Sequence, residues 1–115
     1  MKLGTHQEAF ARDLSKLLTY AQSIGYECRI GEVERTPEQQ AVYVRTGRSK
    51  TFNSMHLKKC AADLHFVLGG VICYPPELGA FWESLSPENR WGGNFDRDWG
   101  KEDNFKDAPH YERQC

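Results

Sequence analysis

The chain has 115 residues and a formal net charge of −1, and 39% of its residues are hydrophobic and 12% aromatic. This composition is that of one folded domain with a modest core, and it excludes a disordered chain. The balanced charge gives no indication of a nucleic acid or an anionic membrane as partner, and no stretch approaches the ~18 apolar residues of a membrane span.

The first ten residues lack the apolar segment of a secretory signal peptide, so we expect the newly made protein in the cytoplasm. In that reducing environment the cysteines are expected to be free thiols. They are Cys28, Cys60, Cys73 and Cys115.

The N-terminal part of the chain predicts a long helix. Apolar residues recur with a helical period over residues 6–24. Thr5 is a candidate N-cap residue, and Gly25 is placed to end the helix in a left-handed conformation. The helix has one apolar face, so we expect it to pack against a sheet.

A strand and a second helix are predicted next. Residues 26–34 alternate imperfectly between apolar and polar types and predict the strand. Thr36 followed by Pro37 is a strong helix start, and this helix is expected to end near residues 45–47. A polar loop over residues 46–54 follows.

The second half of the chain predicts a hairpin, a helix and a last strand. Two apolar runs flank Gly69 and Gly70, which is a hairpin signal. Residues 75–86 predict a short helix, residues 87–111 a long functional loop, and residues 108–112 a strand. This order predicts a single α+β domain with a small, mostly antiparallel sheet flanked by helices.

Two histidines and two aspartates form a candidate metal site. His56 precedes the predicted strand that carries Asp63, so a loop and the adjoining strand bring both to one place. A carboxylate that points into the core needs a cation or a metal beside it. His110 is the best third ligand, and Pro109 favours an extended backbone that lets Asp107 and His110 reach the same pocket.

This set of residues suits the hydrolysis of a peptide bond. A zinc ion held by two histidines and an aspartate would polarise a carbonyl group and lower the pKa of a water molecule. Asp107 would take the proton of that water and pass it to the leaving amine. Arg35 would stabilise the negative charge that develops on the carbonyl oxygen.

These residues also have ordinary explanations. A single His56 or His110 is more often a surface or hydrogen-bonded residue than a ligand. Lys58 and Lys59 fit a solvated face better than a nucleic-acid patch. The three tryptophans are expected in the core or in a pocket wall rather than in a platform that stacks bases. They are Trp82, Trp91 and Trp99.

Three segments resemble the signatures of one enzyme group. SMHLKKCAADL (54–64) resembles the S-x-H-x-x-G-x-A-x-D signature of the zinc D-Ala-D-Ala carboxypeptidase and L-alanyl-D-glutamate endopeptidase group. RTPEQQ (35–40) resembles its R-[ST]-x-x-x-Q segment, and RWGGNF (90–95) with DAPHYE (107–112) resembles its W-G-G-x-W/F and D/E-x-P-H-x-E segments. The segments follow the order of the group, which includes vancomycin-resistance dipeptidases and phage endolysins and shares its fold with the hedgehog signalling domain.

The resemblance implies a hedgehog/DD-peptidase-like fold and a Zn2+ site. The residues that match the zinc ligands of the group are His56, Asp63 and His110. Asp107 matches its catalytic acid and base, and Arg35 matches the arginine that contacts the substrate and the oxyanion.

The resemblance also implies a substrate and a biological setting. Gln40 and Ser54 match positions that support or line the substrate site, and we expect them to bind substrate. The implied substrate is a peptidoglycan stem peptide, cut next to a D-amino acid as by an L-Ala–D-Glu endopeptidase or a D,D-carboxypeptidase. We expect a monomeric phage endolysin, without a nucleic-acid or membrane partner, that stays in the host cytoplasm until its release to the cell wall.

One position departs from the signature, and two other functions stay open. Lys59 stands where the group has Gly, which predicts a backbone that does not need the left-handed conformation here. The alternatives are a catalytically inert, metal-containing module that binds the cell wall or a virion, and a cytoplasmic D-Ala-D-Ala dipeptidase. Because Asp107 is retained with all three ligands, an active enzyme is favoured.

Overall fold

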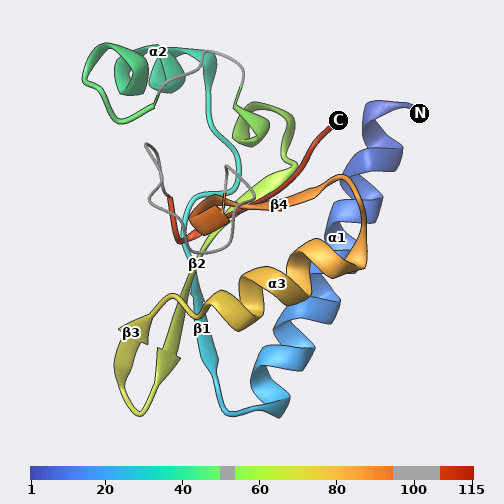
Figure 1. Ribbon diagram of the computed structural model, residues 1–115. Coiled ribbons are helices and arrows are strands. Elements are labelled where there is room, and N and C mark those ends of the chain that lie inside the picture. Colours follow the sequence, from blue (N-terminus) through green and yellow to red (C-terminus); the bar gives the residue numbers. More distant parts are fainter. Residues whose placement is uncertain (50–53, 95–106) are drawn as a thin grey trace.

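One antiparallel sheet organises the molecule. The computed structural model describes residues 1–49, 54–94 and 107–115, and within them five strands pair in the order β1-β2-β5-β4, with β3 on the far end of β2 (Figure 1). The elements are α1 (Leu3–Ser23), β1 (Glu27–Ile30), α2 (Pro37–Arg45), η1 (Met55–Lys58), β2 (Ala61–Leu68), β3 (Val71–Cys73), α3 (Pro76–Leu85), β4 (Asn89–Trp91), η2 (Gly92–Asn94) and β5 (His110–Arg113). The predicted α+β fold with a mostly antiparallel sheet is confirmed.

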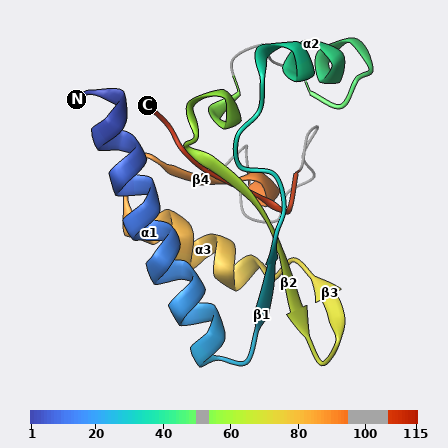
Figure 2. The ribbon, with the colours of Figure 1, turned by 180° about the vertical axis from the view of Figure 1, so that it is seen from behind.

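Helices α1 and α3 cover one face of the sheet and enclose the core (Figures 1 and 2). Leu17 of α1 and Trp82 of α3 are fully buried against Leu64 and Phe66 of β2 and Tyr111 of β5. Successive residues of a strand point to opposite faces, so the neighbours of Tyr111 on β5 point away from this core. Helix α2 lies at the end of the molecule opposite the β2–β3 hairpin.

The predicted first helix is confirmed, but its start is not at Thr5. Helix α1 begins at Leu3 after Lys2, whose side chain makes no capping hydrogen bond, so Thr5 lies inside the helix. The first turn is exposed, and water can satisfy its free N–H groups without a capping side chain. At the other end Gly25 has φ +99°, as predicted.

The second helix begins as its sequence predicts, and the strand before it is shorter than predicted. Thr36 caps α2 by accepting a hydrogen bond from the Gln39 N–H at 3.1 Å. Strand β1 ends at Ile30, although the Gly31 N–H still donates to the Asp63 carbonyl and the Asp63 N–H to the Glu32 carbonyl. The segment after β1 therefore follows β2 as far as the candidate metal site.

The hairpin and the third helix also match the prediction. Gly69 and Gly70 have φ of +58° and +80°, the two positive values of a tight hairpin turn. The predicted long loop, residues 87–111, is partly wrong, because it contains β4 and η2. Residues 95–106 of that loop, with Trp99, and residues 50–53 of the predicted polar loop lie outside the described residues.

The prediction for Lys59 is wrong. Lys59 adopts the left-handed conformation, with φ 57° and ψ 34°, at the end of η1. The Lys59 N–H donates to the His56 carbonyl and the Cys60 N–H to the Met55 carbonyl, and these bonds close the turn in that conformation. The backbone at this position thus has a conformation suited to glycine, although the residue is an exposed lysine. The Lys59 Nζ lies 3.9 Å from a carboxylate oxygen of Glu34.

Two of the three tryptophans lie in the core of the protein. Trp82 is fully buried and Trp91 is 5% exposed, so both belong to the core as predicted.

Among the described residues, no helix has the length and apolar character needed to cross a membrane.

Candidate metal centre and active site

Three side chains bring their ligand atoms into one small triangle. His110 Nδ1 lies 3.1 Å from His56 Nε2 and 3.6 Å from Asp63 Oδ1, and His56 Nε2 lies 3.3 Å from Asp63 Oδ1. A tetrahedral zinc ion with bonds of about 2.0–2.1 Å keeps its ligand atoms roughly 3.3 Å apart. The triangle therefore has the dimensions of three ligands around one ion.

His56 is oriented by a backbone carbonyl. Its ring is almost fully buried in η1, and Nδ1 lies 2.8 Å from the Val33 carbonyl oxygen. Since that oxygen can only accept, Nδ1 carries the proton and Nε2 presents a lone pair to Asp63 and His110. The hydrogen bond to Val33 thus fixes the tautomer that a metal ligand needs.

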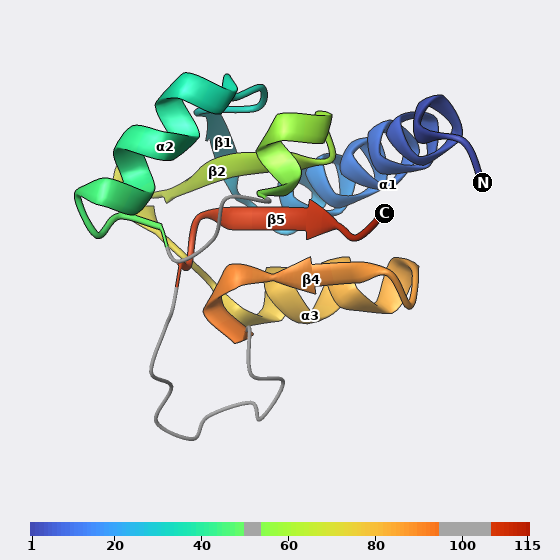
Figure 3. The same cartoon turned by 90° about the horizontal axis from the view of Figure 1, so that it is seen from above.

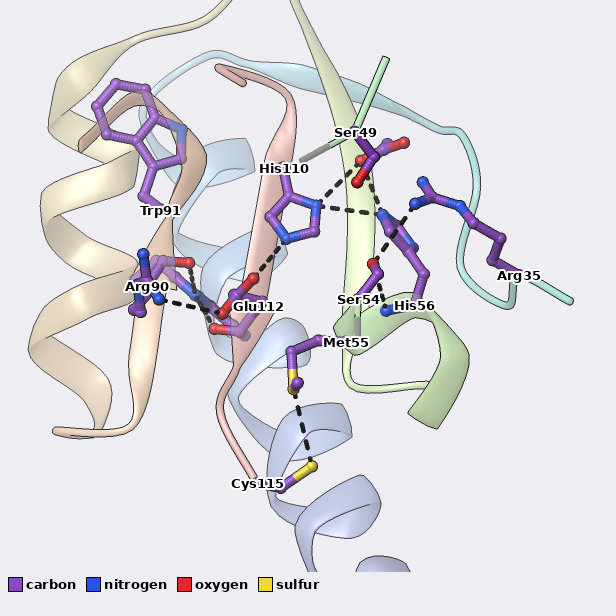
Figure 4. Close-up of polar contacts among 12 residues, drawn as sticks. Arg35, Ser49, Ser54, Met55, His56, Arg90, Trp91, His110, Glu112 and Cys115 are labelled. Carbon is purple, nitrogen blue, oxygen red and sulfur yellow. Dashed lines mark hydrogen bonds and ion pairs between the residues drawn. The ribbon is translucent and has the colours of Figure 1, made fainter. Parts of the chain in front are cut away.

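His110 is oriented by a carboxylate that the sequence analysis did not single out. Its Nε2 lies 2.7 Å from Glu112 Oε1, and the ring turns its other nitrogen toward His56 (Figure 4). Residues 110 and 112 share a face of β5 because side chains alternate along a strand, and this spacing in P-H-x-E was the available signal. Arg90 Nη1 lies 4.0 Å from the other oxygen of Glu112 and balances its charge.

Asp63 reaches the triangle through strand pairing. It lies directly opposite His110 in the β2–β5 register, and these strands, with β4, lie side by side in Figure 3. Asp63 Oδ1 is buried and has no hydrogen-bond partner of good geometry. Burial opposes its ionisation, but the interactions with His110 and His56 outweigh burial and hold the pKa of Asp63 well below its usual range.

The triangle attracts positive charge. Burial alone would lower the pKa of His110, but its interactions with Asp63 and Glu112 raise this pKa to about 9. Two histidine nitrogens and a carboxylate oxygen face one another, so either a proton on His110 or a metal ion stabilises the arrangement. The donor set of two imidazoles and one carboxylate is one that zinc accepts.

Asp107 stands on the turn that leads into β5. Its N–H donates to the Gly92 carbonyl, and its carbonyl accepts from the His110 N–H, each at 2.9 Å. Burial raises the pKa of Asp107; the positive charge of His110 opposes this rise and the Asp63 carboxylate adds to it. A carboxyl group with a raised pKa beside the triangle is suited to exchange protons.

The W-G-G segment holds this turn in place. A Cβ atom on Gly92 would lie 2.0 Å from the Asp107 carbonyl oxygen, so no larger residue fits. Trp91 donates from Nε1 to the Ala108 carbonyl at 2.8 Å, and Cβ atoms on Gly79 and Gly93 would collide with its ring. Three glycines and one tryptophan thus fix the position of Asp107.

Arg35 contacts the two predicted substrate-binding residues. Arg35 Nη1 donates to Gln40 Oε1 at 2.6 Å and approaches Ser54 Oγ at 3.4 Å. Glu32 pairs with Arg35 Nε, and the guanidinium lies 4.6 Å from the centre of the Tyr43 ring. These contacts leave the guanidinium little freedom to move.

Gln40 and Ser54 are buried, at 1% and 8% exposure, so their contacts are with other protein groups. Gln40 Nε2 also donates to Ser49 Oγ at 2.9 Å. Ser54 Oγ accepts from the His56 N–H at 3.2 Å and so caps η1. Both residues hold Arg35 and His56, while their predicted contact with substrate stays a prediction.

The chain is similar in sequence to a known peptidase. It is 38% identical over 116 residues to the L-alanyl-D-glutamate peptidase of Listeria phage A118, a match that covers 95% of the chain and 37% of that relative. The chain therefore spans little more than a third of the length of this curated relative. No protein-family model matches the chain.

A solved structure has the same fold. The L-Ala D-Glu endopeptidase ChiX of Serratia marcescens superposes with a TM-score of 0.63 at 23% sequence identity, over 90% of this chain and 79% of that one. Together with the sequence match, this structure confirms the resemblance drawn from the three motifs.

Proposed function

We propose that this chain, which is related to the phage L-alanyl-D-glutamate peptidase over 95% of its length, is a metal-dependent peptidase of peptidoglycan. The observation that carries the proposal is the convergence of the buried Asp63 Oδ1 with one nitrogen of His56 and one of His110, all within 4.8 Å of one another. An inert domain would gain stability by replacing these groups with apolar ones. Their retention beside Asp107 favours catalysis.

The proposed cofactor is Zn2+, and its proposed ligands are His56 Nε2, Asp63 Oδ1 and His110 Nδ1. When bound, the ion supplies Lewis acidity toward the scissile carbonyl and the attacking water. Val33 and Glu112 fix the two imidazoles in the tautomers that this role needs.

Asp107 and Arg35 supply the remaining chemistry. The Asp107 carboxylate accepts a proton from the attacking water and returns it to the nitrogen of the leaving amine, and its raised pKa brings it closer to neutrality, where this exchange is most effective. Arg35, held by Glu32 and Gln40, presents its guanidinium to the negative charge on the carbonyl oxygen. Ser54 supports this arrangement from the start of η1.

The proposed substrate is the stem peptide of peptidoglycan, cut at the L-Ala–D-Glu bond. The names of both relatives support this bond over the D,D-carboxypeptidase alternative. We propose that residues 1–115 form one zinc peptidase domain that acts as a monomer in phage lysis and reaches the wall from the host cytoplasm.

The test is digestion of purified sacculi followed by mass spectrometry of the products. We expect new L-Ala carboxyl and D-Glu amino termini, complete loss of products with a chelator, and their return with Zn2+. Asp107→Asn, which keeps the size of the side chain, should bind metal but release about 10²–10⁴-fold less product.

Other outcomes identify the alternatives. Stoichiometric metal with binding to sacculi and no products would show an inert wall-binding module. Hydrolysis of free D-Ala-D-Ala without attack on sacculi would show a dipeptidase. Equal digestion with and without chelator would contradict the metal mechanism.

A further inference from the structure

Three sulfur atoms meet beyond the start of β2 and the end of β5, outside the proposed active site. Cys115 Sγ lies 3.7 Å from Cys60 Sγ and 4.0 Å from Met55 Sδ, the second contact being drawn in Figure 4. Cys60 is fully buried, whereas Cys115 is exposed. One thiol of the pair is therefore open to reagents in solution, and the other is reached only through its partner.

The pair connects the two strands that carry the candidate metal ligands. Cys60 immediately precedes β2, and Cys115 lies two residues beyond β5. The Arg113 N–H donates to the Cys60 carbonyl at 2.8 Å, so the two backbones run together up to the thiols. A covalent link here would close a loop that contains Asp63 and His110.

The distance and the surroundings favour a link. A disulfide bond is about 2.05 Å long, so the sulfurs have to approach by less than about 2 Å. Cys115 is exposed and lies two residues beyond the end of β5, so its side chain can make this movement without disturbing the sheet. The Met55 thioether contacts Cys115 from within the fold.

We propose that Cys60 and Cys115 form an intramolecular disulfide when the protein meets a disulfide oxidant. The Cys115 thiolate attacks one sulfur of a small-molecule disulfide such as oxidised glutathione, which breaks that S–S bond and releases one glutathione thiol. The Cys60 thiolate then attacks Cys115 Sγ and releases the second thiol. The protein loses two electrons and two protons, and the oxidant gains them.

The environment of Cys60 sets the rate and the direction of this reaction. Burial and the neighbouring Cys115 thiol raise the pKa of Cys60 to about 12. Since the thiolate is the nucleophile, the second step is slow at neutral pH and faster in alkali. A reduced state without a stabilised thiolate also competes poorly with the disulfide, so the bond resists reduction once it has formed.

The other two cysteines provide an internal control. Cys28 on β1 and Cys73 on β3 both pair with Phe66 of β2, one from each side. Two strand spacings of about 4.8 Å separate them, and this is too far for a disulfide between strands that keep their places. The structure thus allows one disulfide and excludes the other.

The test is peptide mapping of the zinc-loaded chain, under non-reducing conditions, after incubation with oxidised glutathione at mildly alkaline pH. We expect the loss of two hydrogen atoms, a cross-linked peptide that joins Cys60 to Cys115, and a melting temperature raised by about 10 °C that returns to its starting value on reduction. Cys115→Ser should abolish all three results, and Cys73→Ser should preserve them.

The proposal is overturned by a glutathione adduct that persists on Cys115 without a cross-link. It is equally overturned by a cross-link to Cys28 or Cys73, by a disulfide between two copies of the chain, or by a cross-link that leaves the melting temperature unchanged. Because Cys115 is exposed, Cys115→Ser is expected to fold, so its result separates a missing disulfide from a misfolded chain.

Discussion

Strand β2 joins two regions that are built in opposite ways. Its C-terminal end forms a hairpin with β3, where Leu68, Val71 and Ile72 are between 46% and 67% exposed. Its N-terminal end pairs with β5, where Asp63 and His110 are turned into the protein with their ligand atoms facing one another. Apolar groups are thus exposed at one end, and polar groups are enclosed at the other.

The difference lies in what holds each end together. The hairpin needs only two glycines with positive φ, next to each other in the chain. The metal-site end depends on contacts between segments distant in the chain, from Val33 to His56 and from Gly92 to Asp107. It also encloses groups that destabilise the fold until a cation joins them. Substitutions should therefore have larger effects at the metal-site end.

Glycine substitutions give the largest contrast between the two ends. Gly92→Ala should destabilise the protein by about 3 kcal/mol or more, because its Cβ would lie 2.0 Å from the Asp107 carbonyl oxygen and displace the turn. In Gly70→Ala the added Cβ atom would lie in open space, so the protein should lose only about 1 kcal/mol of stability, from the positive φ of this residue. Urea unfolding of both variants measures this difference, and equal losses would contradict it.

The pH dependence of the metal-free protein should expose the metal-site end alone. The pKa of His110 is raised from 6.5 to about 9 in the folded state. Its contribution to stability is complete below pH 6.5 and is lost as the pH rises through about 9, a change of about 3 kcal/mol. The lowered pKa of Asp63 has the opposite sign, so its contribution is present above about pH 4 and is lost in acid.

Urea unfolding with a chelator at pH 6.5 and at pH 9 tests this expectation. His110→Gln is measured beside the wild type to isolate the contribution of the histidine. A wild type that loses no more stability than His110→Gln between the two pH values would refute the proposed role of His110.

The contact between Glu112 and His110 should strengthen metal binding at the metal-site end. Glu112→Gln keeps the shape of the side chain but weakens its hold on the His110 Nε2 proton, and metal affinity should fall about 10–100-fold. Competition with a chromogenic chelator measures this affinity. His65→Ala is the matched control, because His65 lies on the hairpin half of β2 and contacts Tyr74 instead. Equal affinities in the two variants would show that Glu112 has no positioning role.

The smallest effect is expected at Lys59. Lys59→Gly removes the strain of a left-handed backbone and should stabilise the protein by at most about 1 kcal/mol, since glycine also gains entropy in the unfolded chain. Thermal unfolding measures the change. A loss of stability would mean that the ion pair of Lys59 with Glu34 stabilises the protein by more than the left-handed backbone of Lys59 destabilises it.

The same contrast explains how far the sequence could predict the structure. The hairpin and the start of α2 follow from neighbouring residues, Gly69 with Gly70 and Thr36 with Pro37, so both predictions were correct. Strand β4 was missed because its three residues have no local signal and are fixed by pairing with β5. Distant contacts of this kind leave no periodic pattern in the sequence.

The candidate site shows the same limit. The signatures name His56, Asp63 and His110 directly, and the structure brings these three residues together, while their role as metal ligands stays a prediction. The role of Glu112 was missed, although its spacing of two residues from His110 on a predicted strand placed both side chains on one face. The conformation of Lys59 was predicted wrongly because residue type was taken to decide a backbone that the turn itself imposes.

We propose that the triangle of ligand atoms from His56, Asp63 and His110 is a metal site. Isothermal titration of the metal-free protein with Zn2+, paired with elemental analysis, measures metal binding at this site. We predict one ion per chain, proton release from His110 on binding, and loss of the site in Asp63→Asn but not in His65→Ala. Binding of the same strength in Asp63→Asn, or no stoichiometric binding in the wild type, would contradict the claim.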